Sequence, residues 1–338
     1  MRVLIFSDKD PIKFQSKRQL MWLFKFFNKN PHKIHFDLTD SLSYQYMDYD
    51  CIIIHGFNFN NIKTIKKRNP QSKLLLINPG LITEIHELNI FTKKGIKAFL
   101  QKKYIEKYIN GIIVRSEPWK SIVRKNIRTP VYQWIDFEEQ VNNISKKRLK
   151  NLQIIIGYHG SPSHIKKSFQ YCLSEALELL NKHYEFEFHI LTNNISTIKN
   201  SIKGSFPIKF FEYSNVDFEK IINNFDIGLT PTMTSEESLN ETMVLIRNSN
   251  RTISLLARGI PSITSPLPQS LKDLKNNIHT IYAVTADEWF NSLVKLIEDE
   301  KLYNTIRTNG YELVKKNFLV DTAGKKLTKI IESVVNEN

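Results

Sequence analysis

The chain contains very little cysteine and no long apolar run. Its 338 residues include only two cysteines, Cys51 in a predicted strand and Cys172 in a predicted helix. This usage predicts buried thiols in a reducing compartment. No apolar stretch approaches the roughly 18 residues that a membrane-spanning helix needs. Residues 1–8 are typical of a first strand rather than of a signal peptide. We therefore expect a cytoplasmic protein.

The sequence signatures of metal and cofactor sites are also missing. No His/Cys spacing typical of zinc occurs, and there is no Gly-x-Gly-x-x-Gly or Walker loop. The composition, with 41% hydrophobic and 11% aromatic residues, excludes wholesale disorder. A chain of this length is expected to form two domains of ordinary size. We expect neither a metal ion nor a bound cofactor.

Positive charge is abundant, and it is concentrated in the first half of the chain. Residues 1–135 hold 24 Lys and Arg against 10 Asp and Glu, whereas residues 136–338 hold 24 of each, so the whole excess of 14 belongs to the first half. A genomic composition bias would act on both halves alike. The asymmetry therefore predicts an anionic partner for the first half: an anionic lipid surface, nucleic acid or a polyanionic acceptor.

Short apolar runs alternate with amphipathic helical segments in both halves, which predicts two α/β domains with parallel, doubly wound sheets. The strands expected in the first half are Val3–Phe6, Ile34–Asp37, Cys51–His55, Lys73–Ile77, Gly111–Arg115 and Val131–Trp134, and the helices are Ser16–Asn28, Asn60–Arg68, Lys93–Ile109 and Pro118–Lys125. The strands expected in the second half are Leu152–Gly157, Glu187–Leu191, Ile208–Phe211, Ile227–Thr230 and Ser262–Thr264, and the main helices are Ile165–Asn181, Ala286–Asp299, Glu300–Lys316 and Thr322–Val335. The predicted domains are 1–135 and 151–338, joined by the polar linker 136–150. The last helix either belongs to the second domain or packs back on the first.

Two segments of the second half carry the strongest motif. Phe225–Pro231 (FDIGLTP) is a short buried strand that ends in Thr-Pro, and Asn250–Ile263 (NRTISLLARGIPSI) is a helix that leads into a strand. Gly259 ends this helix, because Pro261 forbids its continuation. The pair resembles the donor-binding half of GT-B glycosyltransferases, especially glycosyltransferase family 4, over most of residues 151–335. This resemblance implies two Rossmann-like domains facing a cleft, with a nucleotide-sugar as donor substrate.

The segment Ile156–Lys167 (IGYHGSPSHIKK) resembles the first strand and loop of that family's donor domain. The resemblance places Gly160, Ser161, His164 and Lys166 at the donor. There a glycine turn, a helix N-terminus and a cation can stabilise the diphosphate that leaves when the glycosidic bond breaks. The alternative is an ordinary helix cap with solvated lysines. Ser161 departs from the family pattern, which has an arginine at this position.

Arg251 lies where the family carries a lysine, eight residues before the glycine that ends the helix. A cation at the start of a helix can bind a phosphate together with free backbone N–H groups, although a solvated arginine is the alternative. Thr252 and Ser254 share this helix and are also candidates for donor binding. Ser254 replaces the glutamate that usually contacts the donor ribose in the family. Arg247, just before the helix, is a candidate substitute.

The candidate catalytic residues are His55, Glu236 and Glu237. His55 follows the apolar run in Tyr49–Gly56, which resembles the family's strand that delivers a histidine to the cleft. The carboxyl end of a strand is where α/β active sites lie, although a single histidine also fits a structural role. Glu236 and Glu237 lie in the loop before the Arg251 helix and are candidates to replace the family's missing glutamate pair.

The segment Lys93–Ile109 alternates lysines with apolar and aromatic residues at near-helical spacing. It can lie on an anionic membrane surface with Phe99, Leu100 and Tyr104 near the headgroups, or pack on the core with a solvated basic face. The charge asymmetry favours a membrane or polyanion. No recognition motif supports specific binding of nucleic acid.

Together these features predict a glycosyltransferase on the inner face of the membrane that moves a sugar from a nucleotide-sugar to a glycan or lipid-linked acceptor. The resemblance implies a metal-independent reaction with retention of configuration, and bacterial capsule or lipopolysaccharide synthesis as its setting. Two alternatives stay open. One is a non-catalytic GT-B-like module that binds a glycan or partner, which the replacements at Ser161 and Ser254 favour. The other is a GT-B nucleotide-sugar epimerase, which needs catalytic carboxylates across the cleft.

Overall fold

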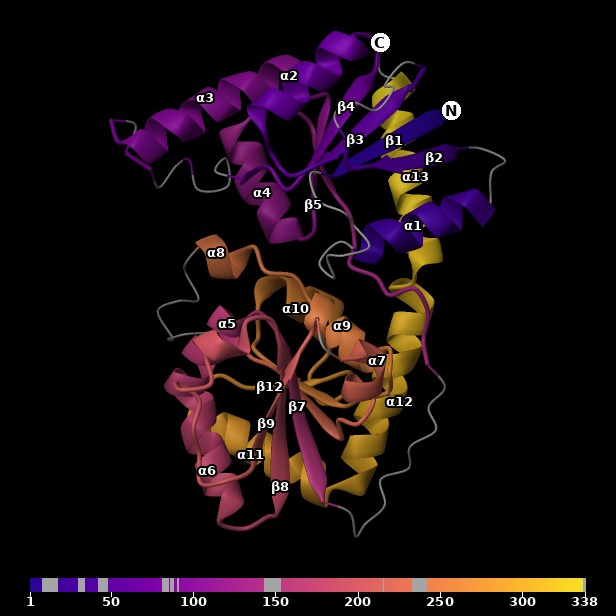
Figure 1. Ribbon diagram of the computed structural model, residues 1–338. Helices are drawn as coiled ribbons and strands as arrows, with labels where there is room; N and C mark the ends of the chain where they lie inside the picture. Colours follow the sequence, from indigo (N-terminus) through magenta and orange to yellow (C-terminus); the bar gives the residue numbers. More distant parts are fainter. Residues whose placement is uncertain are drawn as a thin grey trace. The chain divides into compact units, whose positions relative to one another are not determined.

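The chain folds into two compact units in the computed structural model (Figure 1). The first unit comprises Met1–Glu139 and Val320–Asn338, and the second comprises Gln140–Leu319. The structure describes residues 1–7, 18–29, 34–41, 48–80, 85, 88–89, 91–142, 153–214, 216–232 and 242–336.

The first unit is built on a parallel six-stranded sheet with the strand order β2-β1-β3-β4-β5-β6. Most residues of its central strands are buried on both faces, as expected for a sheet covered by two layers of helices. The strands are β1 (Arg2–Ser7), β2 (His35–Thr39), β3 (Cys51–His55), β4 (Lys73–Ile77), β5 (Gly111–Val114) and β6 (Val131–Gln133).

Helices cover both faces of this sheet (Figure 1). Alternate residues of β1 divide between them: Val3 and Ile5 pack with the helices of one face, and Leu4 and Phe6 with those of the other. The helices of the first face are α1 (Arg18–Lys29) and α13 (Val320–Asn336), and those of the second are α2 (Phe59–Arg68), α3 (Lys93–Tyr108) and α4 (Glu117–Asn126). The Trp134 indole N–H donates to the Ala323 carbonyl at 2.8 Å, which fixes α13 to the first unit.

The second unit repeats this plan with a parallel sheet in the order β12-β11-β10-β7-β8-β9. Its strands are β7 (Ile154–Gly160), β8 (Phe186–Thr192), β9 (Ile208–Glu212), β10 (Ile227–Thr230), β11 (Ser262–Thr264) and β12 (Ile281–Tyr282). Because β7 lies between β8 and β10, the chain reverses its direction of winding beside β7. In open α/β sheets, ligands bind at this switch point, outside the carboxyl ends of the strands.

The helices of the second unit again lie on both faces of its sheet (Figure 1). After β7, the chain stays helical from Pro162 to Asn181 through α5, a five-residue π-helical segment at Phe169–Leu173, and α6. The helices are α5 (Pro162–Ser168), α6 (Ser174–Asn181), α7 (Phe218–Ile222), α8 (Thr242–Leu245), α9 (Asn250–Leu256), α10 (Pro268–Asp273), α11 (Ala286–Glu298) and α12 (Glu300–Asn317).

The structure confirms the predicted alternation of strands and helices and corrects one boundary that matters for the site. We expected the first strand of the second half to end at Gly157, but β7 continues to Gly160. The three extra residues pair with Ile190, Leu191 and Thr192 of β8, so the neighbouring strand determines the end of β7. Among the helices that the structure describes, none combines the length and the hydrophobicity needed to cross a bilayer.

Candidate anion-binding site

The candidate site lies at the carboxyl edge of the second sheet, where β7 runs into α5 and β10 runs into Pro231 and Thr232. Gly160 ends β7 with a positive φ of 148°, a conformation that favours glycine. A Cβ at Gly160 would lie 2.8 Å from the Tyr158 hydroxyl and 3.0 Å from Cδ of Arg251. Glycine therefore suits this position for two reasons: it adopts the positive φ of the turn, and it leaves room for the Arg251 side chain.

Arg251 extends from the first turn of α9 toward the ends of both strands. Its guanidinium donates to the Tyr158 hydroxyl at 3.2 Å, to the Pro231 carbonyl at 3.0 Å and to Oγ1 of Thr232 at 2.8 Å. It also lies over the Tyr158 ring, 5.6 Å from the centroid. These partners are neutral, so they orient the guanidinium without cancelling its charge. No carboxylate of the described residues pairs with it.

Tyr158 provides the rigid support for this arrangement. Its ring is fully buried, and its hydroxyl donates to the Ser161 carbonyl at 2.9 Å. Burial raises the pKa of Tyr158, and the nearby Arg251 opposes that rise without abolishing it. The phenol therefore remains protonated at neutral pH. It can accept from Arg251 while it donates to the turn.

Arg247 and His164 are further titratable neighbours whose pKa values Arg251 influences. Burial, followed by the charge of Arg251, lowers the pKa of Arg247. Burial also lowers the pKa of His164 to about 4, with added contributions from Arg251, Arg247 and Lys167. These shared effects show that His164 and the two arginines lie within electrostatic reach of one another. His164 is accordingly neutral at physiological pH and can donate or accept a hydrogen bond.

Acidic residues do not balance this group within the described part of the chain. Neither Arg247, Arg251 nor Lys166 forms an ion pair with a described residue. Concentrated positive charge at the switch point of a parallel sheet is suited to a multiply charged anion such as a diphosphate.

The Ser161 hydroxyl caps no backbone N–H of α5 and contacts the Ser163 hydroxyl at 2.9 Å.

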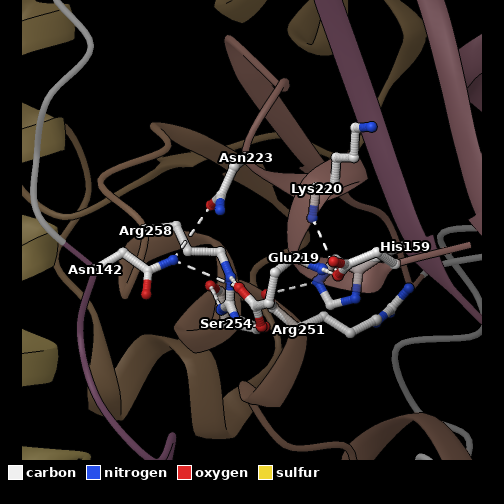
Figure 2. Close-up of polar contacts among 9 residues, drawn as sticks. Asn142, His159, Glu219, Lys220, Asn223, Arg251, Ser254 and Arg258 are labelled. Atoms are coloured by element: carbon white, nitrogen blue, oxygen red, sulfur yellow. Dashed lines mark hydrogen bonds and ion pairs between the residues drawn. The ribbon is translucent and has the colours of Figure 1, made fainter.

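The hydroxyl groups of Thr252 and Ser254 have partners within the protein. Oγ1 of Thr252 contacts the Thr230 hydroxyl at 2.8 Å and the Thr264 hydroxyl at 3.3 Å, which ties α9 to β10 and β11. Ser254 accepts from Arg258 at 3.0 Å (Figure 2). Both residues are buried, so in this structure their side chains position α9.

Arg258 connects Ser254 to a wider polar network (Figure 2). Its guanidinium donates to both carboxylate oxygens of Glu219 on α7, at 2.9 Å from Nε and 2.5 Å from Nη2. Asn142 donates to Glu219 at 3.4 Å and to Asn223 at 3.3 Å. The network thus brings a carboxylate close to Ser254 from a different helix.

Sequence reasoning missed three residues that build this site: Tyr158, His159 and Thr232. The His159 ring nitrogen Nε2 lies 3.2 Å from the Arg251 carbonyl and so contacts the first turn of α9 (Figure 2). An aromatic residue two positions before the strand-ending glycine was the available signal for Tyr158. That signal also fits an ordinary core residue, so it does not identify a site residue by itself.

The candidate catalytic residues fall in other parts of the chain. His55 ends β3 in the first unit, half-buried, and it pairs in register with Ser7 of β1 and Ile77 of β4. Gly56 follows with a φ of 89°. His55 therefore lies at the carboxyl edge of its sheet. Glu236 and Glu237 lie outside the described residues.

Comparison with known proteins identifies the fold. No protein-family model and no curated protein sequence matches the chain. Among solved structures, it is similar to Anabaena Alr3699/HepE in complex with UDP and glucose, with a TM-score of 0.69, 10% identity, and coverage of 98% of this chain and 99% of the other. Sucrose-phosphate synthase from Thermosynechococcus elongatus gives a TM-score of 0.71, 11% identity and full coverage of both chains. A glycosyltransferase from Rickettsia africae gives 0.68, 14% identity, and coverage of 100% and 99%. The chain therefore has the GT-B fold of two Rossmann-like domains.

Proposed function

We propose that the protein is a glycosyltransferase that takes its sugar from a nucleotide-sugar. The observation that carries the proposal is the cationic group around Arg251, which no described acidic residue neutralises. In such a transfer the bond between the sugar and the diphosphate breaks, and the nucleoside diphosphate leaves with added negative charge. We assign Arg251 and Lys166 to stabilising that charge, and Gly160, Ser161, His164 and Arg247 to binding the diphosphate around it.

The comparisons support this proposal at the level of fold. Alr3699/HepE was solved with UDP-glucose, and an alpha-glucosyltransferase of similar fold, with a TM-score of 0.66 and 13% identity, was solved with UDP. The motifs around Gly160 and Arg251 resemble glycosyltransferase family 4. That resemblance is the basis for proposing a metal-independent reaction with retention of configuration.

The acceptor side of the reaction is assigned to the first unit. We propose that its excess positive charge matches a glycan or lipid-linked acceptor at an anionic membrane surface, on the cytoplasmic side. His55, at the carboxyl edge of this unit's sheet, is the proposed contact for the acceptor hydroxyl, with Glu236 and Glu237 as further catalytic candidates. Synthesis of a bacterial surface polysaccharide is the setting that fits such a reaction.

A second candidate function is a GT-B-like module that binds a glycan or partner without catalysis. The observation that favours it concerns Ser254. This residue replaces the family's ribose-contacting glutamate, and its hydroxyl accepts a hydrogen bond from Arg258. In this alternative the anion site still binds a nucleotide. The two functions therefore differ in turnover, and nucleotide binding alone does not separate them.

Two experiments in sequence test the proposal. A thermal-shift screen with UDP, GDP, CMP and their sugars should reveal one nucleotide that stabilises the protein. At about 100 times its Kd, a ligand adds about 2.7 kcal/mol of stability. The sugar form of that nucleotide should then be hydrolysed slowly in the absence of acceptor and transferred faster in its presence. Binding without any hydrolysis or transfer would favour the binding module, and the absence of stabilisation by every nucleotide would refute both.

A further inference from the structure

Helix α3 of the first unit buries mainly small and polar side chains and exposes several large apolar ones. Its buried positions hold Gly95, Ala98, Gln101 and Ile105, of which only the last is a large apolar residue. The Gln101 side chain donates to the Pro79 carbonyl, so this helix docks on the sheet partly through a polar contact. Core packing normally requires the large apolar residues of a surface helix to face inward. In α3, Ile96, Phe99 and Leu100 face outward.

Exposed apolar side chains lie on the outward face of α3 and in the turn that precedes it. Exposed fractions are 85% for Phe91, 50% for Ile96, 47% for Phe99 and 54% for Leu100. Of the six large apolar side chains exposed in the described part of the chain, these four lie within one stretch of ten residues. Single exposed apolar residues are normal on a protein surface, but a contiguous group marks an interaction site. We call these four residues the α3 ridge.

The end of the α3 ridge is held in place by its own turn. The backbone N–H of Phe91 donates to the Asn89 side chain at 2.9 Å, and the Thr92 hydroxyl donates to the Asn89 carbonyl at 2.7 Å. Thr92 also accepts from the Gly95 N–H at 3.0 Å and so caps the helix. Phe91 therefore projects from an ordered turn that continues into α3.

The segment that carries the α3 ridge is rich in lysine and poor in acidic residues. Residues 91–108 contain six lysines and one glutamate. That glutamate, Glu106, accepts a hydrogen bond from the Arg128 N–H, which directs its carboxylate toward the body of the unit. Nζ of Lys103 lies 5.6 Å from the centre of the Phe99 ring. Apolar side chains and lysine ammonium groups are therefore interleaved on one surface.

We propose that the α3 ridge inserts into the headgroup region of an anionic lipid bilayer, with the surrounding lysines on lipid phosphates. Charge complementarity selects this partner, because exposed apolar side chains on a lysine-rich helix match an anionic surface with a hydrocarbon layer beneath it. The inference rests on the proposed membrane association and deepens it. It adds insertion of named apolar side chains to attraction between charges.

The structure also corrects the role expected for Tyr104. We expected it near the headgroups, but its ring lies 5.1 Å from Phe59 and 4.5 Å from Tyr108, and its hydroxyl donates to the Phe59 carbonyl at 3.3 Å. Tyr104 therefore belongs to the contact between α2 and α3. The inserting group begins with Phe91 and includes no residue beyond Leu100.

Vesicle binding by the full chain tests the insertion. Wild type is compared with a ridge variant (Ile96→Ser, Phe99→Ser, Leu100→Ser) and a charge variant (Lys93→Glu, Lys97→Glu, Lys103→Glu). The matched control is Leu271→Ser with Ile278→Ser, because these side chains are exposed to 55% and 40% in the second unit. Vesicles contain phosphatidylcholine alone or an equal mixture with phosphatidylglycerol. Circular dichroism and nucleotide binding confirm that each variant is folded.

The ridge variant should lose on the order of a hundredfold in partitioning to the anionic vesicles, because each half-exposed side chain contributes about fivefold when it is buried. The control should bind like wild type. The charge variant should also lose binding, and high salt should weaken wild type less than it weakens the ridge variant. In wild type carrying Phe99→Trp, tryptophan emission should shift to the blue on the anionic vesicles only.

Three results would overturn the proposal. If the ridge variant binds vesicles as well as wild type while the charge variant does not, the protein adsorbs by charge alone, and only the insertion is wrong. If wild type binds no vesicle, the membrane association itself fails. If the ridge variant instead converts a dimer to a monomer in light scattering without lipid, the ridge contacts a second copy of the chain.

Discussion

Replacing Gly160 with alanine should damage both stability and nucleotide binding. The positive φ at this position costs a residue with a Cβ about 1–3 kcal/mol. The new methyl group would also lie 2.8 Å from the Tyr158 hydroxyl and 3.0 Å from Cδ of Arg251. Tyr158 is fixed by burial and by its bond to Ser161, so Arg251 must move and lose a hydrogen bond of about 1 kcal/mol. We expect the free energy of unfolding to fall by about 2–4 kcal/mol.

Gly56→Ala is the matched control for this prediction. Gly56 also has a positive φ, of 89°, but nothing lies within 4 Å of the position that its Cβ would take. It should therefore show the cost of backbone strain without the displacement of a neighbour. Urea unfolding followed by circular dichroism measures the loss of stability, and calorimetry measures nucleotide affinity. Equal stability of the two variants, together with unchanged nucleotide affinity in Gly160→Ala, would refute the close approach of Arg251 to the turn.

Two further predictions concern the surroundings of Arg251. Tyr158→Phe keeps the buried ring but removes the hydroxyl, so it should lower the free energy of unfolding in urea by about 1 kcal/mol. It should also weaken nucleotide binding, but less than Arg251→Ala does. Equal losses of affinity in the two variants would contradict this. His164 has a pKa lowered from 6.5 to about 4, so the unfolded chain takes up a proton between these pH values while the folded protein does not. The free energy of unfolding should therefore fall as the pH is lowered through this window, and His164→Gln should flatten the fall; an identical pH profile in the variant would show that His164 does not cause it.

The sheets were predictable from sequence because their strands are buried on both faces and form short apolar runs. Cys51–His55 is such a run, and the prediction matches β3 residue for residue. The end of β7 was not predictable, since Tyr158, His159 and Gly160 continue the strand because β8 lies alongside. Short helices such as α7 and α8, of five and four residues, are fixed by tertiary contacts and leave little periodic signal.

The candidate site was predictable only in part. Gly160 and Arg251 could each be recognised from a separate motif, and in the structure Arg251 lies so close to Gly160 that a Cβ there would meet its side chain. The partners of Arg251 could not be read, because Tyr158 precedes it by 93 positions and Thr232 by 19. Ser254 gave no sign that Arg258 would engage it, since the position of that guanidinium depends on Glu219 in another helix. Long-range pairs of this kind are determined by the packing of the unit.

The most direct test of the proposed site is a calorimetric titration of the folded protein with the nucleoside diphosphate found in the screen. A charge-assisted phosphate contact contributes about 1.5–3 kcal/mol, so Arg251→Ala and Lys166→Ala should each weaken binding about tenfold or more. Lys182→Ala, which removes an exposed lysine at the end of α6, should leave affinity unchanged. Wild-type affinity in both the Arg251 and the Lys166 variants would contradict the assignment of these cations to the diphosphate.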